Sequence, residues 1–370
     1  MNPRAESRAG LSRVIESERP TYLLGLVRVA VGVFLLVGTF FAIREVLDHG
    51  YFADAFFIPV LPHAAVASRS VYLALLGLRG VASLLIVIGV QARPALLVAS
   101  SIGLYGLLCD RLEYHNNRYV LELLAFLLAF APCDRSFVLR KGNGGANGPV
   151  WAIWLMKLQI SLVYAASAGS KLVDTDWRGG QVLHIRYLHV LDLAAARGKE
   201  LPNWVHTALS SPFFAELSSK AAIFGELFLA VGLWVARTRP FALWLGVMLH
   251  LGIQLAAHVE IFSFLMGAAY VLFARQELGA RTLHFDPASL RGARIGAVVQ
   301  RLDWLKRFTI EPRAGSFEIV ERDGTSAHGF DAIVALTRAL PLLFPLWLPL
   351  AIAARLRGGG VRVAPAARAP

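Results

Sequence analysis

The sequence predicts an all-α polytopic membrane helical bundle with about eight transmembrane helices, followed by a small cytoplasmic α/β region. Two observations support this prediction. The 370 residues are 56% hydrophobic and only 17% charged, with a mean hydropathy of +0.56, whereas soluble domains are about a quarter charged. Long apolar runs fill most of residues 22–275 and then give way to shorter amphipathic patterns.

The apolar runs divide the chain into spans. A helix that crosses a bilayer needs about 20 mainly apolar residues. Eight segments meet this requirement, the fourth being rather short: 22–46, 70–91, 94–111, 118–134, 150–172, 213–235, 240–257 and 259–275. The expected organisation is therefore a cytoplasmic arm (1–21), a transmembrane domain (22–275), a cytoplasmic region (281–356) and a disordered tail (357–370).

The positive charges predict the orientation. The net charge of +12 is concentrated between the apolar runs, where the positive-inside rule accounts for it, so nucleic acid is not an expected partner. If eight spans alternate, the arginine-rich connections share one side and both termini are cytoplasmic. The Ala-rich, Arg-over-Lys composition suggests a GC-rich bacterium and hence its inner membrane. The opposite connections carry His49, His63, His115, Lys171 and His258.

The longest of these opposite connections runs from about 173 to 212. Its apolar residues are too often interrupted for a span, so we expect a helix lying at the membrane interface, anchored by Trp204. Cys109 and Cys133 stand far apart without metal-ligand spacing, and no metal site is expected.

After residue 275 the pattern becomes that of a small soluble unit. "RTLHF" reads as a strand, 288–305 as an amphipathic helix, and "RFTIEP" and "SFEIVERDG" as further strands. Within 331–356, prolines recur at every fourth position, at Pro341, Pro345 and Pro349. Each proline removes a backbone donor, which favours a broken amphipathic helix against the membrane over a ninth span.

The fifth span ends in "SAGSKLVDTDW", residues 167–177. An apolar pocket would keep the amine of Lys171 neutral and able to accept a proton, whereas Asp174 and Asp176 would favour its ammonium form. Two interpretations stay open here: a proton-handling lysine, or a lysine that snorkels to the interface and pairs with an aspartate. Helical spacing places one polar stripe on this span: Lys157, Ser161, Tyr164, Ala168 and Lys171.

Other ionisable residues also lie inside predicted spans, where they are costly and usually face the bundle interior. Glu122 and Glu226 each need a partner, and Arg28 and Arg79 are the available cations. Two groups share helix faces: His115, Tyr119 and Glu122 in one, and His250 with Gln254 in the other. A purely structural role is also open for each group. His115 could cap a helix, and Glu226 and His250 could belong to a structural hydrogen-bond network.

Three segments together resemble the horizontally transferred transmembrane domain (HTTM) family, which includes the vitamin K-dependent gamma-carboxylases. They are "HNNRYVLELLAFLLAFAPCDR", "LQISLVYAASAGSKLVDTDWRGG", and "GELFLAVGLWVARTRP" with "HLGIQLAAHVEIFSFLM". The second is the most specific, because its aromatic residue, small residues, glycine and Lys-Leu pair, followed by Asp-Trp and a glycine, match the family's pattern.

The resemblance implies a quinone-linked, carboxylase-like enzyme. In the carboxylases, the lysine at the position of Lys171 is implicated as the base that starts hydroquinone oxidation, which leads to an epoxide and to glutamate carboxylation. Reduced vitamin K or menaquinol is the implied cofactor, and the implied partners are membrane lipids and an extracytoplasmic peptide or small substrate. The catalytic candidates are Lys171, His115, Asn117, Glu226 and His250, and the quinone-binding candidates are Tyr164, Tyr119, Gln254 and Trp177.

The chain departs from the carboxylases at two points. Asn117 falls where they have a histidine, and the large extracytoplasmic region that holds their propeptides has no counterpart. A non-catalytic membrane factor for export or maturation of a secreted peptide is therefore the main alternative. A transporter, suggested by Glu122, Glu226 and His250, is a further one.

Residues 281–356 resemble a divergent thiol-disulfide oxidoreductase-like (DCC) domain of thioredoxin-like type, a domain often fused to this family. Asp286 is retained, but Ser289 and Gly292 stand at the two cysteine positions. Without thiols the redox reaction cannot run, so this resemblance implies a docking or stabilising role.

Overall fold

The computed structural model is 70% helical. It describes residues 18–51, 54, 57–60, 66–112, 114–139, 147–149, 151–257, 261–274 and 278–357. The chain forms two compact units, Met1–Ala274 and Arg275–Pro370, each taken by itself below. His63, His258, most of the 1–21 arm and nearly all of the 357–370 tail lie outside the described residues.

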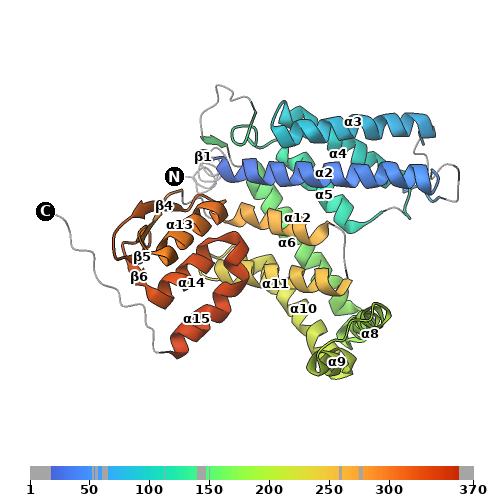
Figure 1. Cartoon of the computed structure of the whole chain (residues 1–370). Helices are drawn as coiled ribbons and strands as arrows, with labels where there is room; N and C mark the ends of the chain where they lie inside the picture. Colours follow the sequence, from blue (N-terminus) through green and yellow to red (C-terminus); the bar gives the residue numbers. More distant parts are fainter. Residues whose placement is uncertain are drawn as a thin grey trace, which may run out of the picture. The chain divides into compact units, whose positions relative to one another are not determined.

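The first unit is built from helices. Figure 1 shows α2 to α5 side by side, with α6 leading from this group toward α8, α9, α10 and α11. A two-stranded antiparallel ribbon joins β1 (Glu18–Pro20) to β2 (Asn147–Pro149). The helices are α2 (Tyr22–Asp48), α3 (Arg69–Ile88), α4 (Ala92–Cys109), α5 (Asn116–Leu128), α6 (Trp151–Val173), α7 (Thr175–Arg178), α8 (Gln181–Ala196), α9 (Asn203–Ser210), α10 (Pro212–Gly232), α11 (Arg239–Ala257), α12 (Phe262–Tyr270) and the 3-10 helix η1 (Val271–Phe273).

Four of the described helices are long and apolar enough to cross a membrane, namely α2, α3, α4 and α6. A bent pair in the second unit raises this to five if it counts as one span. The expected eight spans are therefore not confirmed. Helix α5 has only 13 residues, fewer than the roughly 20 that a span needs. Helix α10 is 21 residues long but carries three charged residues, Glu216, Lys220 and Glu226.

The surface of the first unit is that of a membrane protein. Phe40, Val81 and Phe224 are each more than half exposed on their helices, an arrangement that a soluble monomer avoids over large areas. The interior is close-packed around α2, α3, α4 and α5. At Gly32 a Cβ atom would lie 2.8 Å from Ile86 of α3, so a residue without a side chain lets α2 and α3 approach closely.

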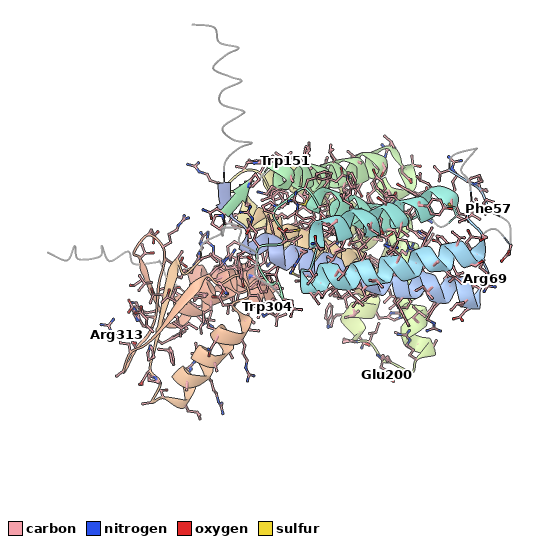
Figure 2. All side chains as sticks on the ribbon, turned by 90° about the horizontal axis from the view of Figure 1, so that it is seen from above. Phe57, Arg69, Trp151, Glu200, Trp304 and Arg313 are labelled. Carbon is pink, nitrogen blue, oxygen red and sulfur yellow. The ribbon has the colours of Figure 1, made fainter. Side chains whose placement is uncertain are left out.

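The two ends of this helical unit can be followed in Figure 2. Phe57, in the connection after α2, lies at the same end as Arg69 at the start of α3, whereas Trp151 at the start of α6 lies near the other end. Helices α8 and α9 occupy the long connection between α6 and α10 and bury none of their residues. Trp204 on α9 is exposed, as expected of an interfacial anchor.

The second unit is the small α/β region that the sequence predicts. Its four-stranded sheet has the order β4-β3-β5-β6, with β3 parallel to β4 and the other pairs antiparallel. The core lies between the sheet and α14 around Leu283, Ile319 and Leu336. The elements are β3 (Arg281–Phe285), α13 (Leu290–Leu302), β4 (Phe308–Pro312), β5 (Phe317–Val320), β6 (Ser326–His328), α14 (Gly329–Ala339), the 3-10 helix η2 (Pro341–Leu346) and α15 (Trp347–Leu356).

Two details of this unit follow from its sequence. Helix α14 ends just before Pro341 and the chain turns by 120°, so the proline-rich stretch is broken as predicted. Ser289, at the first expected cysteine position, accepts a hydrogen bond from the backbone N–H of Gly292 and caps α13. A Cβ at Gly292 would overlap the backbone oxygen of Asp286, so the second position has no room for a thiol.

Candidate functional site

The central feature of the first unit is a close ion pair between the end of α6 and the middle of α10. The Nζ atom of Lys171 donates to both carboxylate oxygens of Glu226, at 2.5 and 2.7 Å, and to Oγ of Ser167 at 2.7 Å. The two side chains are 14% and 7% exposed. Lys171 is therefore neither a lipid-facing anchor nor a free amine. It is a nearly buried cation with a carboxylate of its own.

The expected aspartate partners do not contact this amine. Asp174 instead accepts hydrogen bonds from the backbone N–H groups of Asp176 and Trp177, so it caps α7. Asp176 is exposed in the first turn of that helix. The cap turns the chain so that the Trp177 ring lies 4.9 Å from Lys171 Nζ, within cation–π distance. Of the two interpretations that the sequence left open, the pairing of Lys171 with an aspartate is not found, because Asp174 caps the next helix and Lys171 pairs with Glu226.

Gly180 lies at the end of the segment from Ser167 to Gly180, which we call the Lys171 corner. Its φ is +79°, in the left-handed region that favours glycine, and a Cβ there would overlap the backbone of α10 at Glu216. Ser219 of α10 also donates a hydrogen bond to the Trp177 carbonyl oxygen. The lysine, the capping aspartate, the tryptophan and the glycine of the motif thus all lie where the end of α6 meets α10.

A second polar group lies further inside the unit. Tyr164, two turns before Lys171 on α6, shares hydrogen bonds with Nε2 of His250, at 2.8 Å, and with the hydroxyl of Tyr270. All three side chains are buried, and the two tyrosine rings are stacked. The Glu226 carboxylate interacts electrostatically with both tyrosine hydroxyls. The described hydrogen bonds of this network connect its three residues with one another.

Several polar atoms beside this network have no hydrogen-bond partner among the described residues. They are Nδ1 of His250, Oε1 of Gln254 and Oγ of Ser263. His250 also contacts the ring of Phe262, the neighbour of Ser263. An unpaired buried polar group is costly, so these atoms are candidates for hydrogen bonding to a ligand or water.

The structure does not bring every predicted residue to this site. His115 is exposed at the start of α5 and makes no side-chain cap. Asn117 is half-buried, and its side-chain oxygen accepts from the backbone N–H of Arg118. Tyr119 packs against the ring of Tyr114. No described contact joins His115 or Tyr119 to the Lys171–Glu226 pair. The shared face predicted for α5 exists, but only Glu122 on it is buried.

The remaining intramembrane charges pair elsewhere. Arg79 of α3 donates to Glu122 of α5 in a buried ion pair, one of the pairings that the sequence allowed. Arg28 is fully buried, and its Nη2 donates to the carbonyl oxygen of Phe137 at 2.7 Å. In the part of the chain that the structure describes, no group of three potential ligands could hold a metal ion.

Comparison with known families identifies the first unit. The model of the HTTM domain matches residues 18–277, which contain the whole Lys171 corner and the tyrosine–histidine network. The chain belongs to the HTTM family. No solved structure matches it significantly. The family match ends before the sheet of the second unit, so the DCC-like interpretation of the tail stays a prediction.

Within this HTTM domain the sequence missed one functional candidate, Tyr270. Tyrosine in an apolar run usually reads as a packing residue, and only the contact with Tyr164 distinguishes it. Gly246 of α11 makes room for it, since a Cβ there would overlap the Tyr270 hydroxyl. Chemically, the site combines two groups: an amine paired with a carboxylate, and a buried network of two hydroxyls and an imidazole. This combination can hold and transfer protons away from bulk water.

Proposed function

We propose that this HTTM protein is a quinone-linked, carboxylase-like enzyme of a bacterial inner membrane, with both termini cytoplasmic and Lys171 as its base. One observation carries the proposal: the amine of Lys171 is held, almost buried, against both oxygens of Glu226. A lysine that only anchors a helix at the interface would extend its head toward water.

An ammonium group cannot act as a base, so Lys171 must first lose a proton, and Glu226 is the group that accepts it in this proposal. One proton moves from Nζ to the Glu226 carboxylate, which leaves a neutral amine beside a neutral acid. The amine then accepts a proton from an acidic hydroxyl of the substrate. Ser167 and the Trp177 ring hold Nζ in place during both transfers.

The buried polar atoms beside the network fit a reduced quinone. His250 Nδ1, Gln254 Oε1 and Ser263 Oγ are unpaired, and the ring hydroxyls of a quinol can pair with such atoms. Reduced vitamin K or menaquinol, when bound, would supply the hydroxyl proton and the electrons for reaction with oxygen. The second substrate is proposed to be an extracytoplasmic peptide or small molecule.

The proposal is tested on the purified full chain in lipid nanodiscs. Reduced vitamin K and menaquinol are supplied separately with oxygen, and epoxide is measured by mass spectrometry for the wild type and for Lys171→Ala. The proposal expects epoxide from the wild type and a loss of about 100-fold or more in the variant, the range that a general base contributes. Equal turnover by the two proteins would refute it.

A non-catalytic role in maturation of a secreted peptide is the second candidate. It is supported by Asn117, which replaces the carboxylases' histidine, and by the exposed position of His115. It predicts peptide cross-linking to the protein without any quinol turnover. Absence of both a cross-linked peptide and a membrane partner would count against it.

A further inference from the structure

A cavity of about 840 Å³ lies among α2, α3, α4 and α5 of the first unit. Its lining includes none of the residues that form the Lys171 site described above. Its volume is within the roughly 300–1,000 Å³ of typical small-molecule sites. The wall is largely apolar and aromatic, with contributions from Phe41, Val46, Tyr51, Tyr72 and Leu121.

The buried ion pair of Arg79 and Glu122 belongs to the polar part of this wall, which also includes Arg44, Glu45, Asp48, His49, Asp110 and Arg118. The residues are 7% and 3% exposed, and Nη2 of Arg79 donates to Oε1 of Glu122. Nε of Arg79 and Oε2 of Glu122 have no partner among the described residues. The pair therefore carries one donor and one acceptor that are buried and costly to leave unpaired.

Two glycines keep this space open. A Cβ at Gly103 of α4 would overlap the Glu122 carboxylate, so the glycine makes room for that side chain. Gly38 of α2 also lines the cavity, and a Cβ there would meet nothing within 4 Å. Protein interiors are usually close-packed, so the open space beside Gly38 is an exception to this packing.

We propose that this cavity binds a neutral amphipathic molecule whose polar end donates a hydrogen bond to Glu122 and accepts one from Arg79. The charges of the pair cancel, so a charged group placed against Arg79 and Glu122 would lose its hydration without gaining a free counter-ion from this pair. A hydroxyl group or a primary amide carries both a donor and an acceptor. The apolar body of the ligand contacts the aromatic wall.

The test uses four probes that share one ring system and differ in the polar group: 2-naphthol, 2-naphthamide, 2-naphthoate and 2-(aminomethyl)naphthalene. Binding to the full chain in nanodiscs is measured by equilibrium dialysis at neutral pH. Gly38→Leu places a large side chain in the cavity at a position where a Cβ meets nothing within 4 Å, and it provides the background for partitioning into lipid. Gly77→Leu is the matched control, because a Cβ at Gly77 of α3 also meets nothing within 4 Å but this residue does not line the cavity.

The proposal expects saturable binding of the alcohol, the amide or both, about tenfold or more above the anion and the cation, as expected when buried hydrogen-bonding groups must be matched. Binding should be lost in Gly38→Leu and kept in Gly77→Leu. The preferred neutral probe then identifies the ligand as an alcohol or an amide. No saturable binding, equal binding of all probes, preference for a charged probe, or unchanged binding in a folded Gly38→Leu would each overturn it.

Discussion

The amine of Lys171 and the carboxylate of Glu226, 55 residues apart in sequence, meet through two contacts of 2.5 and 2.7 Å. Removing one partner of a buried pair leaves an uncompensated charge, which costs about 3–5 kcal/mol. We therefore expect Lys171→Met and Glu226→Gln each to lower the melting temperature of the purified protein markedly. The double variant should recover much of this loss, because no charge is then left unpaired.

A matched control lies on the same helix. Lys220 and Glu216 form an ion pair on α10 with side chains 52% and 43% exposed. Exposed pairs of this kind contribute only about 0–1 kcal/mol, so Lys220→Met should leave the melting temperature almost unchanged. If Lys220→Met and Lys171→Met destabilise equally, the Lys171 pair is not buried in the way described.

The corner at Gly180 makes a second prediction. In Gly180→Ala, a strained φ adds to an overlap with the backbone of α10. Gly198 also has a positive φ, of +62°, but a Cβ there meets nothing within 4 Å. Backbone strain alone costs about 1–3 kcal/mol. Gly180→Ala should therefore lower the melting temperature clearly more than Gly198→Ala, and equal shifts would contradict the close approach of the chain to α10.

A third prediction concerns Gly103, which faces the Glu122 carboxylate. Gly103→Ala should destabilise the protein by about 1–3 kcal/mol, the usual cost of overpacking. Gly77→Ala, in open space on α3, should be neutral or slightly stabilising because alanine is the better helix former. The melting temperatures of both variants are measured in the same detergent. An unchanged melting temperature for Gly103→Ala would contradict the close contact between Gly103 and Glu122.

A fourth prediction concerns the hydroxyl of Tyr164. Tyr164→Phe keeps the ring but leaves Nε2 of His250 and the hydroxyl of Tyr270 without their shared partner. Such unpaired buried groups cost about 1–3 kcal/mol each. The exposed Tyr114 offers the control, since Tyr114→Phe should change little. Thermal unfolding should thus separate the two variants, and identical curves would argue against a hydrogen-bonded network.

The long apolar helices were predictable because a continuous apolar run in a bilayer must satisfy its backbone hydrogen bonds internally, as a helix does. The expected spans 22–46, 70–91 and 150–172 differ from α2, α3 and α6 by only a few residues at either end. The fourth span was wrong in length: α5 ends at Leu128, a few residues before Pro132, and proline disfavours continuation of a helix.

The sequence indicated individual residues of the site but not which of them pair. Burial of Glu226 required a cationic partner, and the sequence offered Arg28 and Arg79 as candidates without indicating Lys171. Pairing across 55 positions depends on how α6 packs on α10, which periodicity within one helix does not encode. His115 was expected at the site but is exposed. Helical spacing predicts which residues share a face, but it does not predict which neighbouring helix covers that face.

Lys171→Arg tests the central claim most directly. Arginine keeps the positive charge and can pair with Glu226 through two hydrogen bonds, but it does not release its proton in proteins. With reduced vitamin K or menaquinol and oxygen, the account predicts a folded variant with a melting temperature near that of the wild type and epoxide formation reduced about 100-fold or more. Wild-type turnover by Lys171→Arg would contradict the assignment of Lys171 as the base.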